Sequence, residues 1–212
     1  MMSTQKKLNP LDRVCVINLA RSKDRWDSFS GRWKNGGLTK STPTRVEAID
    51  GRLVDRKSMS IKSYRSMKRG EIGCWLSHRL AWSKKILKGS NLIVVEDDVD
   101  LTRNFSDEVA RVKKTLPDDW EVASFVATPL WRRKYQWTVG NAEQVNADWL
   151  RVHGDCYGAM CYMIKQSVID RLMKSQTMTA PIDVELSRLT RMYVVTKNLV
   201  GCKRMGSCTQ RF

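Results

Sequence analysis

The segment 96–100 places four carboxylates within five residues, directly after the apolar run 91–95. A short β-branched apolar run is typical of a strand buried in an α/β sheet, and ligands of such sheets bind where the strands reach their carboxyl ends. Carboxylates this close repel one another, so we expect a cation among them. Because residues two apart on an extended chain point the same way, either Glu96 with Asp98 or Asp98 with Asp100 could face one ion.

A ligand set made only of oxygens favours Mg²⁺ or Mn²⁺, with the diphosphate of a substrate completing the octahedron. Such an ion would neutralise a departing nucleotide diphosphate, although a strand followed by carboxylates also suits nucleotidyl and phosphoryl transfer. The alternative is a solvated acidic turn, which the preceding apolar strand and the basic character of the whole chain disfavour. We expect Asp98, common to both pairs, to bind the metal directly, and Asp97 to hydrogen-bond a ribose or support the turn.

The elements that must position this cluster are predicted to alternate between strand and helix. Apolar runs predict strands at 14–19, at 45–51 with a terminal Asp-Gly turn, and at 91–95, 120–125, 157–164 and 192–196. Helices are predicted at 23–34, 71–88, 107–116 and 167–173. Segments 57–69 and 141–150 lack a clear period, and we expect the first to be a mobile loop. The order predicts an α/β fold whose mostly parallel central sheet is flanked by helices.

Length and composition indicate one domain that spans residues 1–212. The chain is 42% hydrophobic, enough for a sizeable core, and it ends without a polar tail, as expected for a domain cut from a longer polypeptide. The net charge of +16 favours polyanionic partners, which include nucleic acid, anionic lipid and phosphorylated small molecules. Five basic residues never follow one another, so we expect no basic tail that binds nucleic acid.

The sequence also indicates a compartment. The N-terminus lacks the apolar core of a secretory signal, and the longest uncharged apolar stretch, 122–131, is about half the length of a membrane-spanning helix. We therefore expect no transmembrane segment. The six cysteines include no Cys-x-x-Cys pair, which is typical of reduced thiols in the cytoplasm. Because the chain has only two histidines and no evident Cys and His cluster, we expect no zinc site.

Several short motifs of the chain together resemble one known family. In order they are Ile17-Asn18-Leu19 with Arg21, Asp24 and Arg25; Glu47-Ala48-Ile49-Asp50-Gly51; Gly70-Glu71-Ile72-Gly73-Cys74-Trp75-Leu76-Ser77-His78 with Trp82; Glu96-Asp97-Asp98; Tyr157-Gly158 with Tyr162; and Pro181-Ile182-Asp183. With these motifs the chain resembles glycosyltransferase family 25, the family of lipopolysaccharide-type glycosyltransferases and collagen galactosyltransferases. The third and fourth motifs together are specific, whereas each of the others alone is weak.

The resemblance implies a Rossmann-like fold of the GT-A kind and a metal-dependent glycosyltransferase. Such an enzyme moves a sugar from a nucleotide-diphosphate donor, expected to be UDP-linked, to a hydroxyl of a glycan or glycoprotein acceptor, with inversion at the sugar. It would use Mn²⁺ or Mg²⁺. Two features depart from the family pattern. The chain is compact, which puts acceptor contacts in doubt, and Asp100 adds a second Asp-x-Asp register to the acidic cluster.

The same resemblance implies a set of donor-binding residues. Arg21 and Arg25 follow the first strand, where a nucleotide would lie, and could contact phosphate bidentately, although exposed helix charges would look the same. His78 stands in the specific motif, yet a lone histidine on an amphipathic helix is equally a structural hydrogen-bonding group. The residues expected to contact the donor are Asn18, Leu19, Arg21, Arg25, His78 and Asp97.

An inverting reaction needs a general base that removes the proton of the acceptor hydroxyl. Asp155 and Asp183 are the first candidates, and Glu185 and His153 stand behind them. We narrowly prefer Asp155, which precedes the glycine-containing segment Tyr157-Gly158, where the backbone could approach a sugar. Asp183 has the support of the Pro-Ile-Asp motif but could instead cap the helix that follows.

Two other classes of protein remain as alternatives. A basic nucleic-acid-binding module would account for the charge but leaves the acidic cluster unexplained, so we expect no nucleic-acid partner. A non-catalytic carbohydrate-binding domain would keep the fold without the metal. Trp131 and Trp137 lie in a polar, charged stretch and could stack on sugar rings, although most tryptophans belong to the core.

Overall fold

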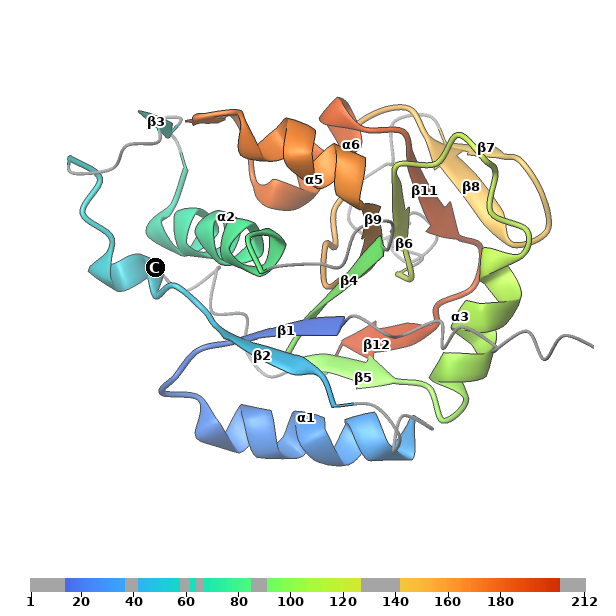
Figure 1. Ribbon diagram of the computed structural model, residues 1–212, viewed down its shortest axis with the longest axis horizontal. Coiled ribbons are helices and arrows are strands. Elements are labelled where there is room, and N and C mark those ends of the chain that lie inside the picture. Colours follow the sequence, from blue (N-terminus) through green and yellow to red (C-terminus); the bar gives the residue numbers. More distant parts are fainter. Residues whose placement is uncertain are drawn as a thin grey trace, which may run out of the picture.

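A computed structural model of the protein describes residues 14–36, 42–57, 62–63, 67–84, 91–126 and 142–202 (Figure 1). At its centre is an eight-stranded sheet with the strand order β2-β1-β4-β9-β6-β11-β8-β7. In that order the strands span Thr44–Glu47, Val14–Asn18, Asn91–Glu96, Cys161–Lys165, Val122–Ser124, Met192–Val195, Trp149–Val152 and Ala142–Gln144.

The directions of the strands confirm the predicted α/β sheet. β1 pairs in parallel with β2 and β4, and β6 pairs in parallel with β11. β9 runs antiparallel between β4 and β6, and β8 runs antiparallel between β11 and β7. Strands β1, β2, β4, β6, β7 and β11 therefore share one direction, while β8 and β9 are reversed. The apolar run at 157–164 predicts a strand there but carries no signal for its direction.

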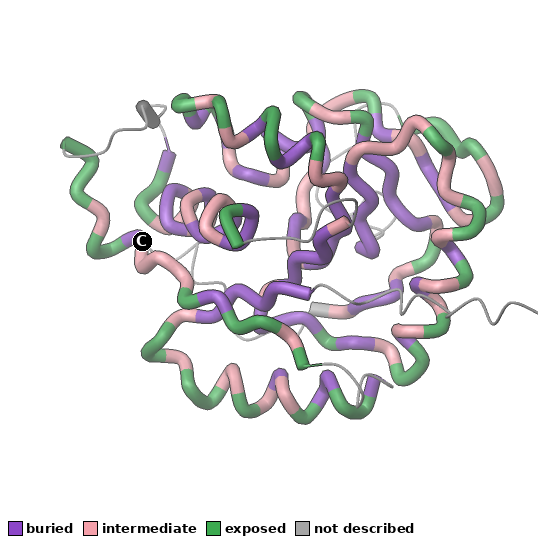
Figure 2. Tube along the Cα trace, viewed as in Figure 1, coloured by how far each residue is buried: buried purple, intermediate pink, exposed green. Residues whose placement is uncertain are grey.

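Helices cover both faces of the sheet (Figure 1). Successive residues of a strand point to opposite faces, so Leu92 and Val94 of β4 join one core layer and Ile93 and Val95 join the other. Figure 2 shows the central strands as the most continuously buried part of the chain. The first layer lies under α2, α5 and α6, which span Arg69–Trp82, Gln166–Met173 and Ile182–Leu189, and the second lies against α1 and α3, which span Lys23–Asn35 and Phe105–Lys113.

Two smaller sheets complete the fold. β5 (Val99–Leu101) follows β4 after a short turn and pairs antiparallel with β12 (Val200–Cys202). β3 (Lys62–Ser63) pairs in parallel with β10 (Thr177–Met178). β3 lies in the segment expected to be a loop, and β7 and β8 lie in the weakly patterned segment. These short strands are paired by distant parts of the chain, which a local pattern does not reveal.

The connections around β1 create a switch point in the sheet. The chain passes from β1 to β2 through α1 on one face, and from β2 to β4 through α2 on the opposite face. The register aligns Ile17 with Val46 and with Glu96, so the carboxyl ends of the three strands meet at one edge. Open α/β sheets bind ligands in the crevice at such an edge.

Backbone packing holds the segment after β2 against α2. A Cβ atom on Gly51, in the 3₁₀ turn η1 (Gly51–Leu53), would lie 1.9 Å from the Arg69 carbonyl oxygen, and one on Gly73 would lie 2.6 Å from the Gly51 nitrogen. The hydroxyl of Ser77 accepts the Ile49 N–H at 2.8 Å and donates to the Gly73 carbonyl at 2.6 Å. The backbones of η1 and α2 therefore approach each other so closely that only glycine fits at these two positions. This contact forms one wall of the crevice.

Candidate functional site

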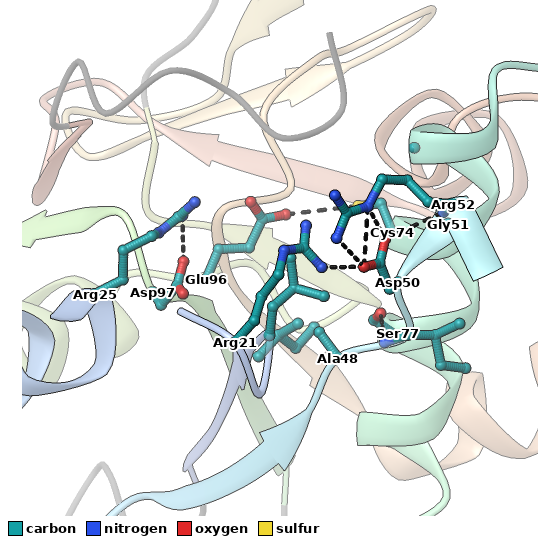
Figure 3. Close-up of a pocket in the computed structure, with 14 residues that line it drawn as sticks. Arg21, Arg25, Ala48, Asp50, Gly51, Arg52, Cys74, Ser77, Glu96 and Asp97 are labelled. Carbon is teal, nitrogen blue, oxygen red and sulfur yellow. Dashed lines mark hydrogen bonds and ion pairs between the residues drawn. The ribbon is translucent and has the colours of Figure 1, made fainter. Parts of the chain in front are cut away.

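A cavity lies at the carboxyl ends of β1, β2 and β4 (Figure 3). It is lined by residues that follow β1, by the segment 48–52 that follows β2, and by Glu96 at the end of β4. The structure thus brings part of the acidic cluster to the switch point of the sheet. The predicted donor-binding residues that line this cavity are Leu19, Arg21, Arg25 and Asp97.

Two arginines share one carboxylate in the cavity wall. Arg21 donates from Nη1 to Asp50 Oδ2, and Arg52 donates from Nη2 to the same oxygen at 2.7 Å (Figure 3). The hydrogen bond from Arg52 is the main cause of a pKa of Asp50 below its ordinary value. Because the two guanidinium groups share this carboxylate, Arg21 can turn toward a phosphate ligand while Arg52 keeps Asp50 paired.

Asn18 ties together the ends of the three strands. It is fully buried, and its side-chain Nδ2 donates to Asp97 and, at 3.1 Å, to the Ser22 carbonyl oxygen. Its Oδ1 accepts a hydrogen bond from Arg45 Nε at 3.0 Å. The amide is therefore occupied by protein partners, and Asn18 lies beneath the predicted donor site as a support for Asp97.

Asp97 is the anchor of the turn between β4 and β5. Its carboxylate accepts hydrogen bonds from Asn18 and Arg25, and its backbone nitrogen donates to the Ile17 carbonyl at 3.2 Å. Burial raises the pKa of Asp97, while Asn18 and Arg25 act in the opposite direction. Of the two roles expected for Asp97, these contacts correspond to support of the turn.

A buried arginine of α1 holds the same turn from the other side. Arg32 donates from Nη2 to the Asp97 carbonyl at 2.7 Å and from Nε to the Val99 carbonyl at 2.9 Å. Burial lowers its pKa, and Asp100 raises it. Arg32 is not among the site residues predicted from the sequence. Its position beside Phe29 and within the buried stripe of α1 is the signal that could have identified it.

Asp98 is a buried carboxylate of the cluster with one oxygen unsatisfied within the described part of the chain. It is buried, and among the described residues its Oδ1 has no hydrogen-bond partner. Arg25 Nη2 lies 3.4 Å from its other oxygen. Burial, followed by the charge of Glu96, raises the pKa of Asp98 to about 7. A buried carboxylate oxygen without a partner is costly unless a cation or a donor reaches it.

Asp100 lies apart from this group. Its side chain is 53% exposed and faces Arg32, with 3.9 Å between Oδ1 and Nε. It lines a separate hollow on the α1 side together with Asn35 and Arg103. The structure therefore groups Glu96, Asp97 and Asp98 and directs Asp100 elsewhere.

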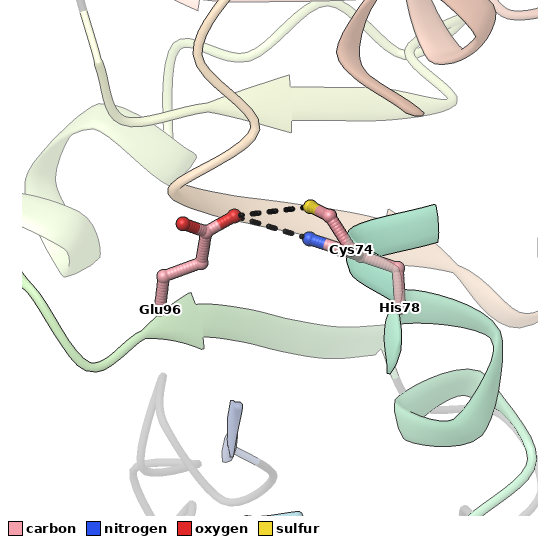
Figure 4. Close-up of side chains that lie close together, drawn as sticks. All are labelled: Cys74, His78 and Glu96. Carbon is pink, nitrogen blue, oxygen red and sulfur yellow. Dashed lines mark hydrogen bonds and ion pairs between the residues drawn. The ribbon is translucent and has the colours of Figure 1, made fainter. Parts of the chain in front are cut away.

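Glu96 reaches from the end of β4 to α2 (Figure 4). Its Oε1 lies 3.3 Å from His78 Nε2 and 3.8 Å from Cys74 Sγ. His78 is fully buried, and its Nδ1 lies 2.8 Å from the hydroxyl of Tyr162. The histidine therefore lies behind Glu96, and it does not line the cavity.

Proton positions in this network follow from Trp82, whose indole N–H can only donate. Tyr162 accepts that N–H at 2.9 Å and can then give its own proton to His78 Nδ1. His78 then carries its proton on Nε2 and donates it to Glu96. Every group is satisfied in this arrangement, so α2 orients the Glu96 carboxylate. Burial raises the pKa of the Cys74 thiol, and Glu96 and Asp183 raise it further.

Asp183 lies in the first turn of α6, close enough to Glu96 for the charge of Glu96 to affect it. Its Oδ2 accepts the Gly158 N–H and its Oδ1 accepts the Val184 N–H, both at 3.0 Å. Gly158 has a φ of 105°, a conformation that favours glycine. Burial raises the pKa of Asp183, the two N–H groups lower it, and Glu96 raises it again. Pro181 occupies the N-cap position of α6, so the cap role considered for Asp183 is not observed.

The other candidate bases have different surroundings. Asp155 forms a two-pronged ion pair with Arg188, at 2.6 and 2.8 Å, and both side chains are exposed. Glu185 is buried and accepts the indole N–H of Trp75 beneath α2. His153 is exposed beside a glutamate of β7. Trp131 and Trp137 lie outside the described residues.

The convergence of Cys74, His78 and Glu96 is not predicted from the sequence. Their ligand-capable atoms all lie within 4.8 Å of one another, although no Cys and His cluster is evident in the sequence. The available signal is the spacing of Cys74 and His78, which are four residues apart and therefore share one face of α2. Their joint direction toward Glu96 depends on the packing of α2 over β4.

Among the described helices, none combines the length and hydropathy that a membrane span requires. The chain is 30% identical to procollagen galactosyltransferase 2 of Homo sapiens over 127 residues, which cover 52% of this chain and 20% of that protein. It is 27% identical to a glycosyltransferase 25 family member of Aedes aegypti over 193 residues, covering 82% of this chain and 30% of the relative. It is 26% identical to inactive glycosyltransferase 25 family member 3 of Homo sapiens over 192 residues, with the same coverages of 82% and 30%.

The chain thus spans less than a third of the length of these relatives. The family as a whole gives a broader match. The model of glycosyltransferase family 25 (LPS biosynthesis protein) matches residues 12–186, a range that includes β1, the cavity and the start of α6. The chain belongs to glycosyltransferase family 25.

Proposed function

We propose that this chain transfers a hexose from a nucleotide-diphosphate donor, UDP-linked by preference, to a hydroxyl group of a glycan acceptor, with inversion at the sugar. The observation that carries the proposal is the partnerless buried oxygen of Asp98, which stands at the switch point of the sheet next to an arginine-lined cavity. The arginines of the cavity suit the phosphates of an anionic donor, and the orphaned carboxylate suits a cation that binds with the donor.

Asp98 and Glu96 are the residues that fit a divalent metal. Asp98 offers an oxygen without a hydrogen-bond partner among the described residues, and Glu96 offers the carboxylate oxygen that His78 and Cys74 do not contact. Both ligands are hard oxygens, which Mn²⁺ and Mg²⁺ prefer. When bound, such an ion would neutralise charge on the departing diphosphate. Asp100 is the less suitable partner for Asp98 because it faces Arg32 in a separate hollow.

The arginines of the cavity would bind the diphosphate. Arg21 is 39% exposed in its side chain and shares Asp50 with Arg52, so it can turn toward an anion without leaving a carboxylate unpaired. Arg25 is anchored to Asp97 and lies next to Asp98, where it would balance the charge of donor and metal together. Leu19 would contribute apolar contact in the same wall.

We propose Asp183 as the general base, ahead of Asp155. The Asp183 carboxylate is close enough to Glu96 and Cys74 for their charges to affect one another, and its raised pKa favours proton uptake. Asp155 forms a two-pronged ion pair with Arg188 at the surface, so both of its carboxylate oxygens are already engaged by a protein partner. In this assignment the base takes the acceptor proton directly as the sugar is transferred.

The names of the relatives are compatible both with a protein that transfers a sugar and with a protein that has lost this activity. One is named a procollagen galactosyltransferase, which favours a hexose donor, and another is named an inactive family member. A non-catalytic domain would keep the cavity but lack turnover. The partnerless oxygen of Asp98 favours the catalytic alternative. In a domain that binds no metal, this buried and unsatisfied carboxylate would only lower the stability of the fold.

The test is a thermal-shift and calorimetric titration of the chain with UDP and Mn²⁺, together and separately, followed by hydrolysis assays of a panel of UDP-hexoses. We expect UDP with Mn²⁺ to raise the free energy of unfolding by about 2.7 kcal/mol at a hundredfold excess over Kd, and either alone to raise it much less. Equal stabilisation by UDP in EDTA would contradict the metal assignment. Stabilisation by DNA alone would reject the enzyme, and binding without hydrolysis or transfer would favour the non-catalytic alternative.

A further inference from the structure

Three side chains with metal-binding atoms converge between α2 and the end of β4. Cys74 and His78 lie one helical turn apart on the face of α2 that looks toward Glu96 (Figure 4). Their Sγ and Nε2 atoms and the Glu96 carboxylate oxygen all lie within 4.8 Å of one another. This cluster differs from the acidic run in chemistry, because it combines a sulfur and a nitrogen with one oxygen.

Two of the three separations between the ligand atoms match those of a tetrahedral zinc centre. Typical zinc bond lengths at a tetrahedral angle place a nitrogen and an oxygen ligand about 3.4 Å apart, and a sulfur and an oxygen ligand about 3.6 Å apart. The corresponding distances here are 3.3 Å, from His78 Nε2 to Glu96 Oε1, and 3.8 Å, from Cys74 Sγ to Glu96 Oε1. A cation could therefore replace the present hydrogen bonds with little movement of the backbone.

The surroundings provide the other features of a metal site. The ring nitrogen of His78 that faces away from the cluster contacts the Tyr162 hydroxyl at 2.8 Å, as ligating histidines commonly contact a second group. With zinc on Nε2, His78 would carry its proton on Nδ1 and donate it to the Tyr162 oxygen, and the Cys74 thiol proton would pass to solvent. Cys74 and Glu96 line the cavity, which gives access to the ion and room for a water as fourth ligand.

We propose that Cys74, His78 and Glu96 form a binding site for a thiophilic divalent cation, best suited to Zn²⁺, and that its occupation inhibits donor binding. The inhibitory part rests on the proposed function, in which Glu96 helps to hold the hard metal that accompanies the donor. A zinc ion on Oε1 would draw the carboxylate toward α2 and place a second positive ion close to the first. Zinc and the donor complex would then exclude each other.

The site itself is tested with Co²⁺, which reports a cysteine ligand through a thiolate-to-metal charge-transfer band. We expect this band in the reduced wild-type chain and in the matched control Cys161→Ala, because Cys161 is buried against the opposite core layer. Cys74→Ser should lose the band, and His78→Gln should weaken cobalt binding by at least about tenfold. If one variant fails to fold, the other variant still tests the assignment. A folded wild-type chain without the band, or a Cys74→Ser chain that keeps it, overturns the site.

The inhibition is tested by measuring the affinity for UDP in saturating Mn²⁺ as Zn²⁺ is added. At a hundredfold excess of Zn²⁺ over its own Kd, strict exclusion lowers the apparent donor affinity of the wild-type chain about a hundredfold. In Cys74→Ser, added Zn²⁺ should leave the affinity for UDP nearly unchanged. If Zn²⁺ merely replaces Mn²⁺ in the donor complex, it would change the affinity equally in both chains, and the proposal that zinc and donor exclude each other would be overturned. A cobalt band in a chain that never binds UDP with Mn²⁺ would reject the proposed function and keep the cation site.

Discussion

Replacing Asp98 by asparagine distinguishes the proposed role of this residue in metal binding from its effect on the stability of the fold. The substitution keeps the shape of the side chain and removes the charge that Arg25 only partly balances, at 3.4 Å from one oxygen. In the absence of metal, an ionised Asp98 is unfavourable because it is buried and close to Glu96. We therefore expect Asp98→Asn to be more stable than the wild-type chain without metal and to lose the stabilisation that metal and donor provide.

The size and the pH dependence of this gain follow from the pKa. The pKa of Asp98 rises from 3.8 to about 7 on folding, and each unit corresponds to about 1.4 kcal/mol, so full ionisation lowers the free energy of unfolding by at most about 4 kcal/mol. Between these two pKa values the folded state binds the extra proton, so this loss of stability begins above pH 4, grows as pH rises and levels off above pH 7. Part of the loss is present at pH 5. We expect the advantage of Asp98→Asn to increase by about 2.5 kcal/mol from pH 5 to pH 8.

Urea unfolding at pH 5 and pH 8, in EDTA and with UDP and Mn²⁺, measures both effects. The matched control is Asp100→Asn, because Asp100 belongs to the same acidic run but is half exposed and faces Arg32. The control should change stability by less than about 1 kcal/mol and keep the response to UDP and Mn²⁺. An advantage of Asp98→Asn that does not vary with pH would refute the electrostatic reasoning. A normal response of that variant to UDP and Mn²⁺ would refute the metal assignment.

Two further substitutions, each with its matched control, test the base and the crevice wall. Asp183→Asn should preserve the affinity for donor and metal while lowering kcat by roughly a hundredfold to ten thousandfold, whereas Asp155→Asn should turn over nearly like the wild type. Equal losses in both variants under saturating donor would exclude this choice of base. Gly73→Ala should lower the free energy of unfolding by about 2 kcal/mol or more, since its Cβ would lie 2.6 Å from the Gly51 nitrogen. Gly31→Ala, which meets no atom within 4 Å on helix α1, should raise it by about 0.5–1 kcal/mol, and urea unfolding that gave both alanines the same sign would contradict the packing argument.

The sequence predicts the part of the fold that is encoded by local periodicity. The buried strands β1 and β4 and the helix α1 lie where the apolar pattern places them, because fully apolar β-branched runs and helical spacing of aromatic residues have few alternative structures. The edge where these strands end follows from the same pattern together with the rule for ligand sites in α/β sheets. Strand direction does not follow from the pattern: β9 runs antiparallel to both of its neighbours, and its apolar run carries no signal for direction.

Within the site, the sequence predicts which residue types meet but not what each one contacts. Asn18 and Asp97 stand in motifs expected to touch the donor, yet their side chains hydrogen-bond to each other and to further protein groups. Arg32 looks like an ordinary helix charge until the β4–β5 turn is packed against α1. His78 has its partner Tyr162 on a strand more than eighty residues away, and such a pairing depends on the register of the sheet.

The charge of the whole chain explains why metal and donor should bind together. A net charge of +16 attracts an anionic donor and repels a free divalent cation, so the local carboxylates must overcome an unfavourable surrounding field to hold the ion alone. Within the acidic run, Asp97 is neutralised by Arg25, Glu96 is held by His78, and Asp98 alone keeps a buried oxygen without a described partner. One such oxygen is a weak site for a bare ion. Joined to the two phosphates of a nucleotide-sugar donor, each of which carries one negative charge, the ion forms a nearly neutral complex, so the positive field of the chain no longer opposes its binding.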